Sequence, residues 1–254
     1  MRNFLVMLVV VTILTVVGAR VLRHQGSTPA AVHGDVLRVR NLFTNIYGAR
    51  VGDRAILFDA GVDEAGGALD ILLGALHADR DAVSDVFLTH GHFDHVAAAP
   101  LCTKARIRVG AEDVKLLAQE VPAGRMAARW MAADFSVPPI KATDPYSGPA
   151  TIAIGGGRSV KVFPLPGHTL GSYLLLFDGV LIAGDSLQIQ GDSLGFAMGP
   201  FSDDMDANRR NIAALKTVLA GETIEVICTG HQACTPPGRA RAMLDDLIAR
   251  AAAS

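Results

Sequence analysis

The sequence lacks the features that define several classes of protein. Only three of its 254 residues are cysteines, too few for a disulfide-built scaffold. Charged residues make up 19%, sum to a net charge of −2 and form no block of one sign, so no nucleic-acid partner is expected. The glycines follow no period, which excludes a collagen-like or solenoid repeat. Half of the residues are hydrophobic, which is enough to bury a full core and excludes a disordered chain.

The N-terminal segment differs from the rest of the chain. Asn3–Ala19 contains no charged residue and is flanked by Arg2 and Arg20. This pattern predicts that residues 1–24 form a membrane anchor or a signal peptide, and both alternatives stay open. Residues 25–31 are expected to form a linker and residues 32–254 a single domain. The expected location is membrane-anchored or exported, with the domain on the extracytoplasmic side and the membrane as a partner of the N-terminal segment.

The remaining residues alternate between patterns typical of strands and of helices. Asp178-Gly179 joins two apolar runs and predicts a hairpin, while Ala65–Ala78 has helical spacing of leucine and isoleucine. Ser202 is expected to cap a helix that extends to about Leu219. Two β-rich halves with helices predict a mixed α/β fold, a four-layer αββα sandwich. Hairpins argue against a purely parallel sheet.

Histidines and aspartates follow the ends of several predicted strands. His90, His92, Asp94 and His95 form a His-x-His-x-Asp-His run. Residues two apart in extended backbone point the same way, so His90 and His92 can bind one metal ion, with Asp94 and His95 facing a second. His168, Asp185 and His231 each follow a strand and a glycine. Imidazole and carboxylate ligands suit zinc, and also iron or manganese.

This run and its partners resemble the metallo-β-lactamase superfamily over about residues 36–235. The resemblance implies that His90, His92 and His168 bind the first of two Zn²⁺ ions, that Asp94, His95 and His231 bind the second, and that Asp185 bridges them. It also implies the αββα fold, and a role for Asp59 in orienting a ligand histidine.

The expected activity is that of a dinuclear metal-dependent hydrolase. A hydroxide that bridges the two ions would attack an ester, lactone or thioester of a small-molecule substrate, with Asp94 as the catalytic residue that orients the water or moves its proton. True zinc β-lactamases carry Cys or Ser where this chain has Asp185, and only 23 residues follow His231, too few for the C-terminal domain of glyoxalase II. Two alternatives remain: a mononuclear iron dioxygenase acting on thiol persulfides, and a non-catalytic metal-binding module.

Two segments are candidates for the walls of a substrate site. Residues 121–147, which include Met126, Trp130, Met131, Phe135 and Tyr146, are interpreted either as a lid or as a helix face packed on the core. Residues 188–200, with Phe196 and Met198, form the candidate opposite wall. Cys228 and Cys234 can pair only outside a reducing compartment, and the sequence cannot show whether their geometry allows it.

Overall fold

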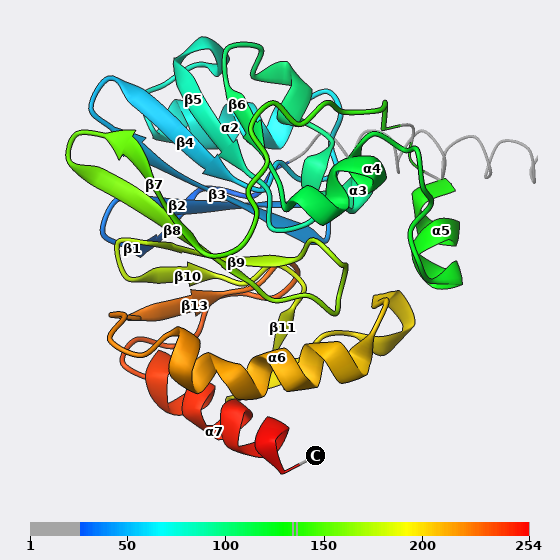
Figure 1. Ribbon diagram of the computed structural model, residues 1–254. Helices are drawn as coiled ribbons and strands as arrows, with labels where there is room; N and C mark the ends of the chain where they lie inside the picture. Colours follow the sequence, from blue (N-terminus) through cyan, green and yellow to red (C-terminus); the bar gives the residue numbers. More distant parts are fainter. Residues whose placement is uncertain (1–25, 134, 136, 254) are drawn as a thin grey trace, which may run out of the picture.

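The computed structural model describes residues 26–133, 135 and 137–253. A six-stranded sheet forms one half of the molecule (Figure 1). Its strands lie side by side in chain order, and β4 to β6 are parallel while the others are antiparallel. They are β1 (Ala30–His33), β2 (Val36–Asn41), β3 (Thr44–Val51), β4 (Arg54–Phe58), β5 (Val83–Phe87) and β6 (Arg106–Arg108).

A five-stranded sheet forms the other half. The expected Asp178-Gly179 hairpin joins two of its strands, and the last strand of the chain pairs in parallel at one edge. In spatial order the strands are β13 (Val226–Cys228), β10 (Val180–Ile182), β9 (Tyr173–Phe177), β8 (Arg158–Pro164) and β7 (Ala150–Gly155). A separate hairpin, which the sequence analysis did not predict, consists of β11 (Leu187–Gln190) and β12 (Ser193–Phe196).

Helices cover the outer faces of both sheets (Figure 1). Those of the first half are α2 (Gly67–Ala75), α3 (Phe93–Val96) and α4 (Val114–Leu117), with the short 3₁₀ turns η1 (Arg80–Ala82), η2 (Ala99–Leu101) and η3 (Ala111–Asp113). The second sheet is covered by α6 (Met205–Val218) and α7 (Ala240–Ala252). Helix α5 (Met126–Ala133) projects from the side of the molecule, beside η4 (Gly199–Phe201).

Three layers of buried apolar side chains hold this arrangement together. One lies between the first sheet and α2 and includes Leu57 and Leu72, and another lies between the second sheet and α6 and α7, where Leu181 and Leu244 are fully buried. The middle layer joins the two sheets and contains Phe58 and Phe177, whose ring centroids are 5.7 Å apart. Because each sheet buries both faces, its strands are apolar on both sides. The predicted αββα sandwich is confirmed.

The boundaries of some elements differ from those expected. Helix α6 begins at Met205, and its N-cap is Asp204, whose side chain accepts a hydrogen bond from the Ala207 backbone amide. The expected cap at Ser202 was therefore wrong, because Ser202 Oγ instead bonds the Met198 carbonyl at 2.8 Å. Residues 30 and 31, expected in the linker, pair with β2.

The expected membrane anchor or signal peptide, residues 1–24, lies outside the described residues. Within the part of the chain that the structure describes, no helix combines the length and the apolar character needed to cross a bilayer.

Candidate metal centre

The candidate ligands lie in loops at one edge of the two sheets. The chain after β5 carries His90 and His92 and enters α3, whose short turn carries Asp94 and His95. Loops after β8, β10 and β13 supply the other three side chains. The structure brings together all seven residues singled out in the sequence: His90, His92, Asp94, His95, His168, Asp185 and His231.

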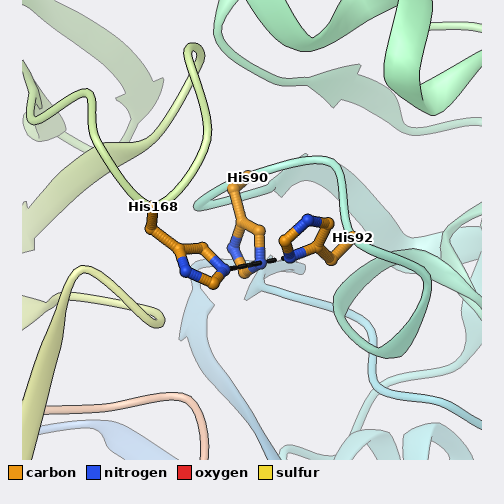
Figure 2. Close-up of side chains that lie close together, drawn as sticks. All are labelled: His90, His92 and His168. Carbon is orange, nitrogen blue, oxygen red and sulfur yellow. Dashed lines mark hydrogen bonds between the residues drawn. The ribbon is translucent and has the colours of Figure 1, made fainter. Parts of the chain in front are cut away.

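His90, His92 and His168 form one compact group, called here the three-histidine group (Figure 2). The Nε2 atom of His168 lies 3.2 Å from His90 Nε2 and 2.9 Å from His92 Nδ1. Nitrogens bound tetrahedrally to one zinc ion at 2.0–2.1 Å would be about 3.3 Å apart. Both distances from His168 are therefore close to the spacing of ligands around one zinc ion, and all three ligand atoms lie within 4.8 Å of one another.

Asp94, His95 and His231 form a second group, called here the acidic group, which Asp185 joins to the first. Asp94 Oδ2 lies 3.7 Å from His95 Nε2 and 3.5 Å from His231 Nε2. Asp185 Oδ2 lies 2.8 Å from His231 Nε2 and 3.7 Å from His168 Nε2, and its Oδ1 lies 3.4 Å from His95 Nε2. Asp185 thus contacts members of both groups.

Burial and neighbouring charges shift the pKa values of the two groups in opposite directions. Burial, together with nearby histidines, lowers the pKa of His92 to about 4 and that of His168 to about 3. Burial also favours the neutral form of His95, but Asp185, Asp94 and Asp59 outweigh it and raise its pKa well above the usual value. The three-histidine group is thus neutral, and the acidic group concentrates opposite charges.

In three of the histidines, a hydrogen bond to the nitrogen that points away from the site orients the ring. His95 Nδ1 lies 2.8 Å from Asp59 Oδ2, and His231 Nδ1 lies 3.1 Å from the Phe43 carbonyl. Both oxygens only accept, so each Nδ1 carries a proton, and Nε2 is the nitrogen that faces the site and would lose its proton to a bound metal ion. His168 Nδ1 has the same arrangement with Ser202 Oγ at 3.0 Å, because Ser202 donates its own proton to Met198.

Two buried aspartates tie the ligand loops together. Asp59 accepts from the Thr89 amide at 2.7 Å as well as from His95, which places it where the sequence analysis expected an orienting carboxylate. Asp113, which the sequence analysis did not single out, accepts from the amides of Gly91 and Gly171 at 2.8 Å each. It thereby fastens the loop of His90 and His92 to the loop that follows His168. No local motif distinguishes Asp113 from other aspartates near helix starts.

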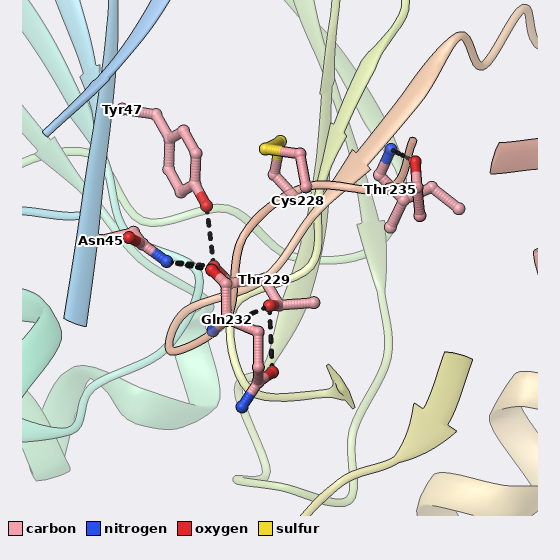
Figure 3. Close-up of a disulfide and its surroundings, with 8 residues drawn as sticks. Asn45, Tyr47, Cys228, Thr229, Gln232 and Thr235 are labelled. Atoms are coloured by element: carbon pink, nitrogen blue, oxygen red, sulfur yellow. Dashed lines mark hydrogen bonds between the residues drawn. A yellow bond between two sulfur atoms is a disulfide. The ribbon is translucent and has the colours of Figure 1, made fainter. Parts of the chain in front are cut away.

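A disulfide closes the loop that carries His231. Cys228 and Cys234 are bonded, six residues apart in the chain (Figure 3). From the first sheet, Asn45 Nδ2 donates to the Thr229 carbonyl at 3.1 Å, and Tyr47 Oη donates to the same oxygen at 2.8 Å. The loop of His231 is therefore held from both sheets, covalently on one side and by hydrogen bonds on the other.

Free polar atoms show that the centre suits a cation. His95 Nε2 and Asp185 Oδ1 are buried and make no hydrogen bond within the described part of the chain. The two atoms lie 3.4 Å apart as an ion pair, and a buried polar atom without a hydrogen bond costs about 1–3 kcal/mol, which a bound cation would offset. A Cβ atom at Gly230 would lie 2.2 Å from Asp185 Oδ1 and 2.6 Å from His95 Cε1, so only glycine leaves this space open. Nitrogen and carboxylate donors of this kind suit zinc, iron and manganese.

A cavity of about 290 Å³ opens over the ligands. Its walls come from both candidate segments: Ala128 and Met131 of α5 on one side, and Gln188, Met198 and the adjoining Phe201 on the other. Among the described residues that line it, none is lysine or arginine. The full lining is Phe43, His92, Phe93, Asp94, Ala128, Met131, His168, Asp185, Leu187, Gln188, Met198, Phe201, His231 and Gln232.

Other residues of the two candidate walls lie elsewhere. Tyr146 is buried between the sheets and donates its hydroxyl to the Leu88 carbonyl, so it is part of the core and not of a lid. Phe196 packs towards α6 and α7, with the guanidinium of Arg209 over its ring. Met126 and Trp130 are exposed, so they neither line the cavity nor pack on the core.

Comparison with known proteins identifies the family. A sequence profile of the metallo-beta-lactamase superfamily matches residues 39–231. Metallo-beta-lactamase domain-containing protein 1 of Xenopus laevis is 30% identical over 179 residues, 67% of this chain and 64% of that protein. A hydroxyacylglutathione hydrolase of Anaeromyxobacter dehalogenans is 32% identical over 136 residues, 54% of this chain and 43% of the relative. The chain thus spans less than two thirds of the length of these relatives.

Solved structures show the same fold. A beta-lactamase from Chitinophaga pinensis superimposes with a TM-score of 0.63 at 21% identity, covering 88% of this chain and 91% of that one. The profile match, the seven gathered side chains and the αββα layers agree, and the chain belongs to the metallo-β-lactamase superfamily.

Proposed function

We propose that this protein is a dinuclear metal-dependent hydrolase of uncharged thioesters, esters or lactones. One observation carries the proposal: seven histidine and aspartate side chains gather at one place, and five of them line a cavity whose other lining residues are apolar apart from Gln188 and Gln232. Divalent metal ions, when bound, lower the pKa of water to about 7 and polarise a substrate carbonyl.

The division of the ligands follows the two groups. His90, His92 and His168 would hold one ion, because their nitrogens already lie at ligand spacing. Asp94, His95 and His231 would hold the other, and Asp185 would contact both. Zinc is the first candidate metal, with two ions expected per chain, and iron or manganese also suit these donors.

Asp94 is the residue proposed to receive the proton of the attacking water. It lines the cavity, and its carboxylate faces both histidines of the acidic group. Burial raises the pKa of Asp94, and the charge of Asp185 adds to the effect. A carboxyl group whose pKa lies closer to the working pH is a better acceptor and donor of protons.

The lining of the cavity favours a substrate without negative charge. The curated relatives include hydroxyacylglutathione hydrolases, which supports a thioester as the bond that is cleaved. Glutathione itself carries carboxylates, and the described lining residues include no lysine or arginine to pair with them. We therefore propose an acyl thioester or ester whose acyl part contacts Phe43, Met131 and Met198.

The test combines metal analysis with a matched panel of substrates. The purified full chain is assayed for zinc, iron and manganese, and then for hydrolysis of neutral acyl thioesters, esters and lactones beside acylglutathiones of equal acyl length. We expect about two metal ions per chain. We also expect the neutral compounds to be hydrolysed faster than the acylglutathiones. A metal-loaded chain that is inert towards every member of the panel would overturn it. One iron per chain with oxygen uptake on a persulfide would instead establish the dioxygenase.

A further inference from the structure

Helix α5 carries its large apolar side chains on the side that faces solvent. Met126 is 68% exposed and Trp130 is 74% exposed, while the smaller Ala128 is buried. Met126 and Trp130 are four residues apart and share one face of the helix. A surface helix of a globular protein normally has the opposite arrangement, with its large apolar residues turned inward.

This exposed face adjoins the mouth of the cavity. Met131 on the same helix and Met198 near η4 are both partly exposed, and both line the cavity. We call Met126, Trp130, Met131 and Met198 the apolar rim. Contiguous exposed apolar surface beside a binding site marks a surface that another apolar phase or molecule covers.

The charged residues around the rim are of the kind found at lipid surfaces. Residues 121–133 contain two arginines and no aspartate or glutamate, and Glu120 and Asp134 flank this stretch. Arg125 donates to the Ser202 carbonyl at 2.8 Å, and Arg129 donates to the Ala123 carbonyl at 2.6 Å. Both guanidinium groups bond carbonyls at the edge of the rim, and Asp203, close to Gly124, offsets part of their positive charge. Tryptophan and arginine beside apolar side chains are typical of helices that lie at a membrane interface.

The chain outside the described residues joins the domain near the same place. Gly26 bridges Asn41, two residues before Phe43, which lines the cavity. Upstream, six residues separate it from the uncharged run Asn3–Ala19. Six residues span at most about 20 Å, so a lipid surface that takes up Asn3–Ala19 would lie within reach of the cavity mouth.

We propose that the apolar rim docks into a lipid surface, so that an acyl substrate dissolved in the bilayer enters the cavity without crossing water. The second half of this statement rests on the proposed hydrolase function, whereas the docking does not. The free energy comes from removing Met126 and Trp130 from water, with Arg125 and Arg129 near the lipid phosphates.

Trp130 is the only tryptophan in the chain and reports directly on docking. The full chain is reconstituted into vesicles of phosphatidylcholine and phosphatidylglycerol, with or without brominated acyl chains. The proposal expects Trp130 emission to shift to shorter wavelength and to be quenched by the brominated lipid. Emission typical of water, without quenching, would overturn it. A shifted but unquenched emission would also overturn it, because the N-terminal segment or a second copy of the chain would then cover the rim.

A matched pair of variants tests the rim itself. Met126→Glu changes an exposed residue outside the cavity lining, whereas Ile71→Glu places the same charge on an exposed apolar position of α2. Met126→Glu should abolish the lipid quenching of Trp130 and slow hydrolysis of a vesicle-bound ester at least about tenfold, without changing hydrolysis of a soluble short-chain ester. Ile71→Glu should change neither. If no ester of either kind is hydrolysed while Trp130 is still quenched, the hydrolase proposal fails and the docking stands.

Discussion

Different interactions hold the ligand side chains together in the three-histidine group and in the acidic group. The first consists of neutral, fully buried rings whose pKa values burial lowers, and hydroxyl and amide hydrogen bonds hold its loops. The second joins carboxylates to histidines, and His231 keeps 30% of its side chain exposed. One group depends on shape and burial, and the other on charge and on a cross-linked loop. Changes of charge and changes of shape should therefore act on them unequally.

The largest effect is expected where the two groups meet. Asp185→Asn removes the negative charge that contacts both groups but keeps the size of the side chain. We expect turnover to fall by at least about 1,000-fold, equivalent to about 4 kcal/mol, while the fold persists. The measurement is kcat beside metal content and circular dichroism. Full activity in this variant would refute the dinuclear hydrolase.

A buried carboxylate outside both groups shows what the loss of a charge does away from the metal ligands. Asp85 lies on β5, which leads to His90, and Arg106 and Arg108 donate to its carboxylate at 2.9 and 2.8 Å. Asp85→Asn removes one of the two carboxylates that Arg108 contacts, since Asp144 stays, and should lower the free energy of unfolding by about 2 kcal/mol. Metal content should not change. Denaturant unfolding and elemental analysis measure the two quantities.

The contribution of Asp85 should also depend on pH. Burial raises the pKa of Asp85, but the hydrogen bonds from Arg106 and Arg108 outweigh this and lower it below the usual value. The stabilisation is therefore present above the pKa of the unfolded carboxyl, about 3.9, and is lost as pH falls through the lower folded value. The difference in stability between wild type and Asp85→Asn should shrink over that acid range. A constant difference would contradict this account.

A smaller effect is expected from the carboxylate that orients a single ligand of the acidic group. Asp59→Asn weakens the bond that fixes the proton on His95 Nδ1. Loss of such a partner typically costs 10–100-fold in metal affinity or activity, so a loss of about 30-fold is expected. Competition with a chelator should show one metal ion released more readily, and the other retained by the three-histidine group. Equal weakening of both ions would mean that the groups are not independent.

The smallest effect is expected from a hydroxyl that supports the three-histidine group. Ser202→Ala removes the acceptor of His168 Nδ1 but leaves the ring packed by its buried neighbours. One neutral hydrogen bond is worth about 1 kcal/mol, so activity should fall about fivefold. Steady-state kinetics measures this loss. A loss as large as that of Asp59→Asn would show that burial alone does not hold this group.

The sequence predicted the layers of the fold and the ligand candidates because both depend on local patterns. Apolar runs ending in glycine and histidine place His168 and His231 at strand ends, and the structure brings them together. The role of Ser202 could not be predicted, since a serine before three aspartates matches a helix cap equally well. Asp113 was missed for a similar reason, because its partners Gly91 and Gly171 lie 22 and 58 residues away.

The segment around α5 shows a different limit of sequence reasoning. Its spacing of methionine and tryptophan indicates either a lid or a helix face packed on the core, and the structure has a helix here. Periodicity does not say which way that face points, and here Met126 and Trp130 face solvent. Only the three-dimensional position of Ala128 against the cavity fixes the rotation of the helix.

The cross-link between Cys228 and Cys234 has a consequence for how the centre matures. Thiolates are strong ligands for zinc, and before oxidation these two sulfurs flank the loop that presents His231. A chain that meets zinc in the reduced state can therefore trap the ion on the wrong atoms. If the disulfide forms before zinc is bound, neither sulfur can act as a ligand, and the donors left beside His231 are nitrogen and oxygen atoms. The disulfide thus acts on the centre before any metal is bound, by limiting which atoms of this loop are available to it.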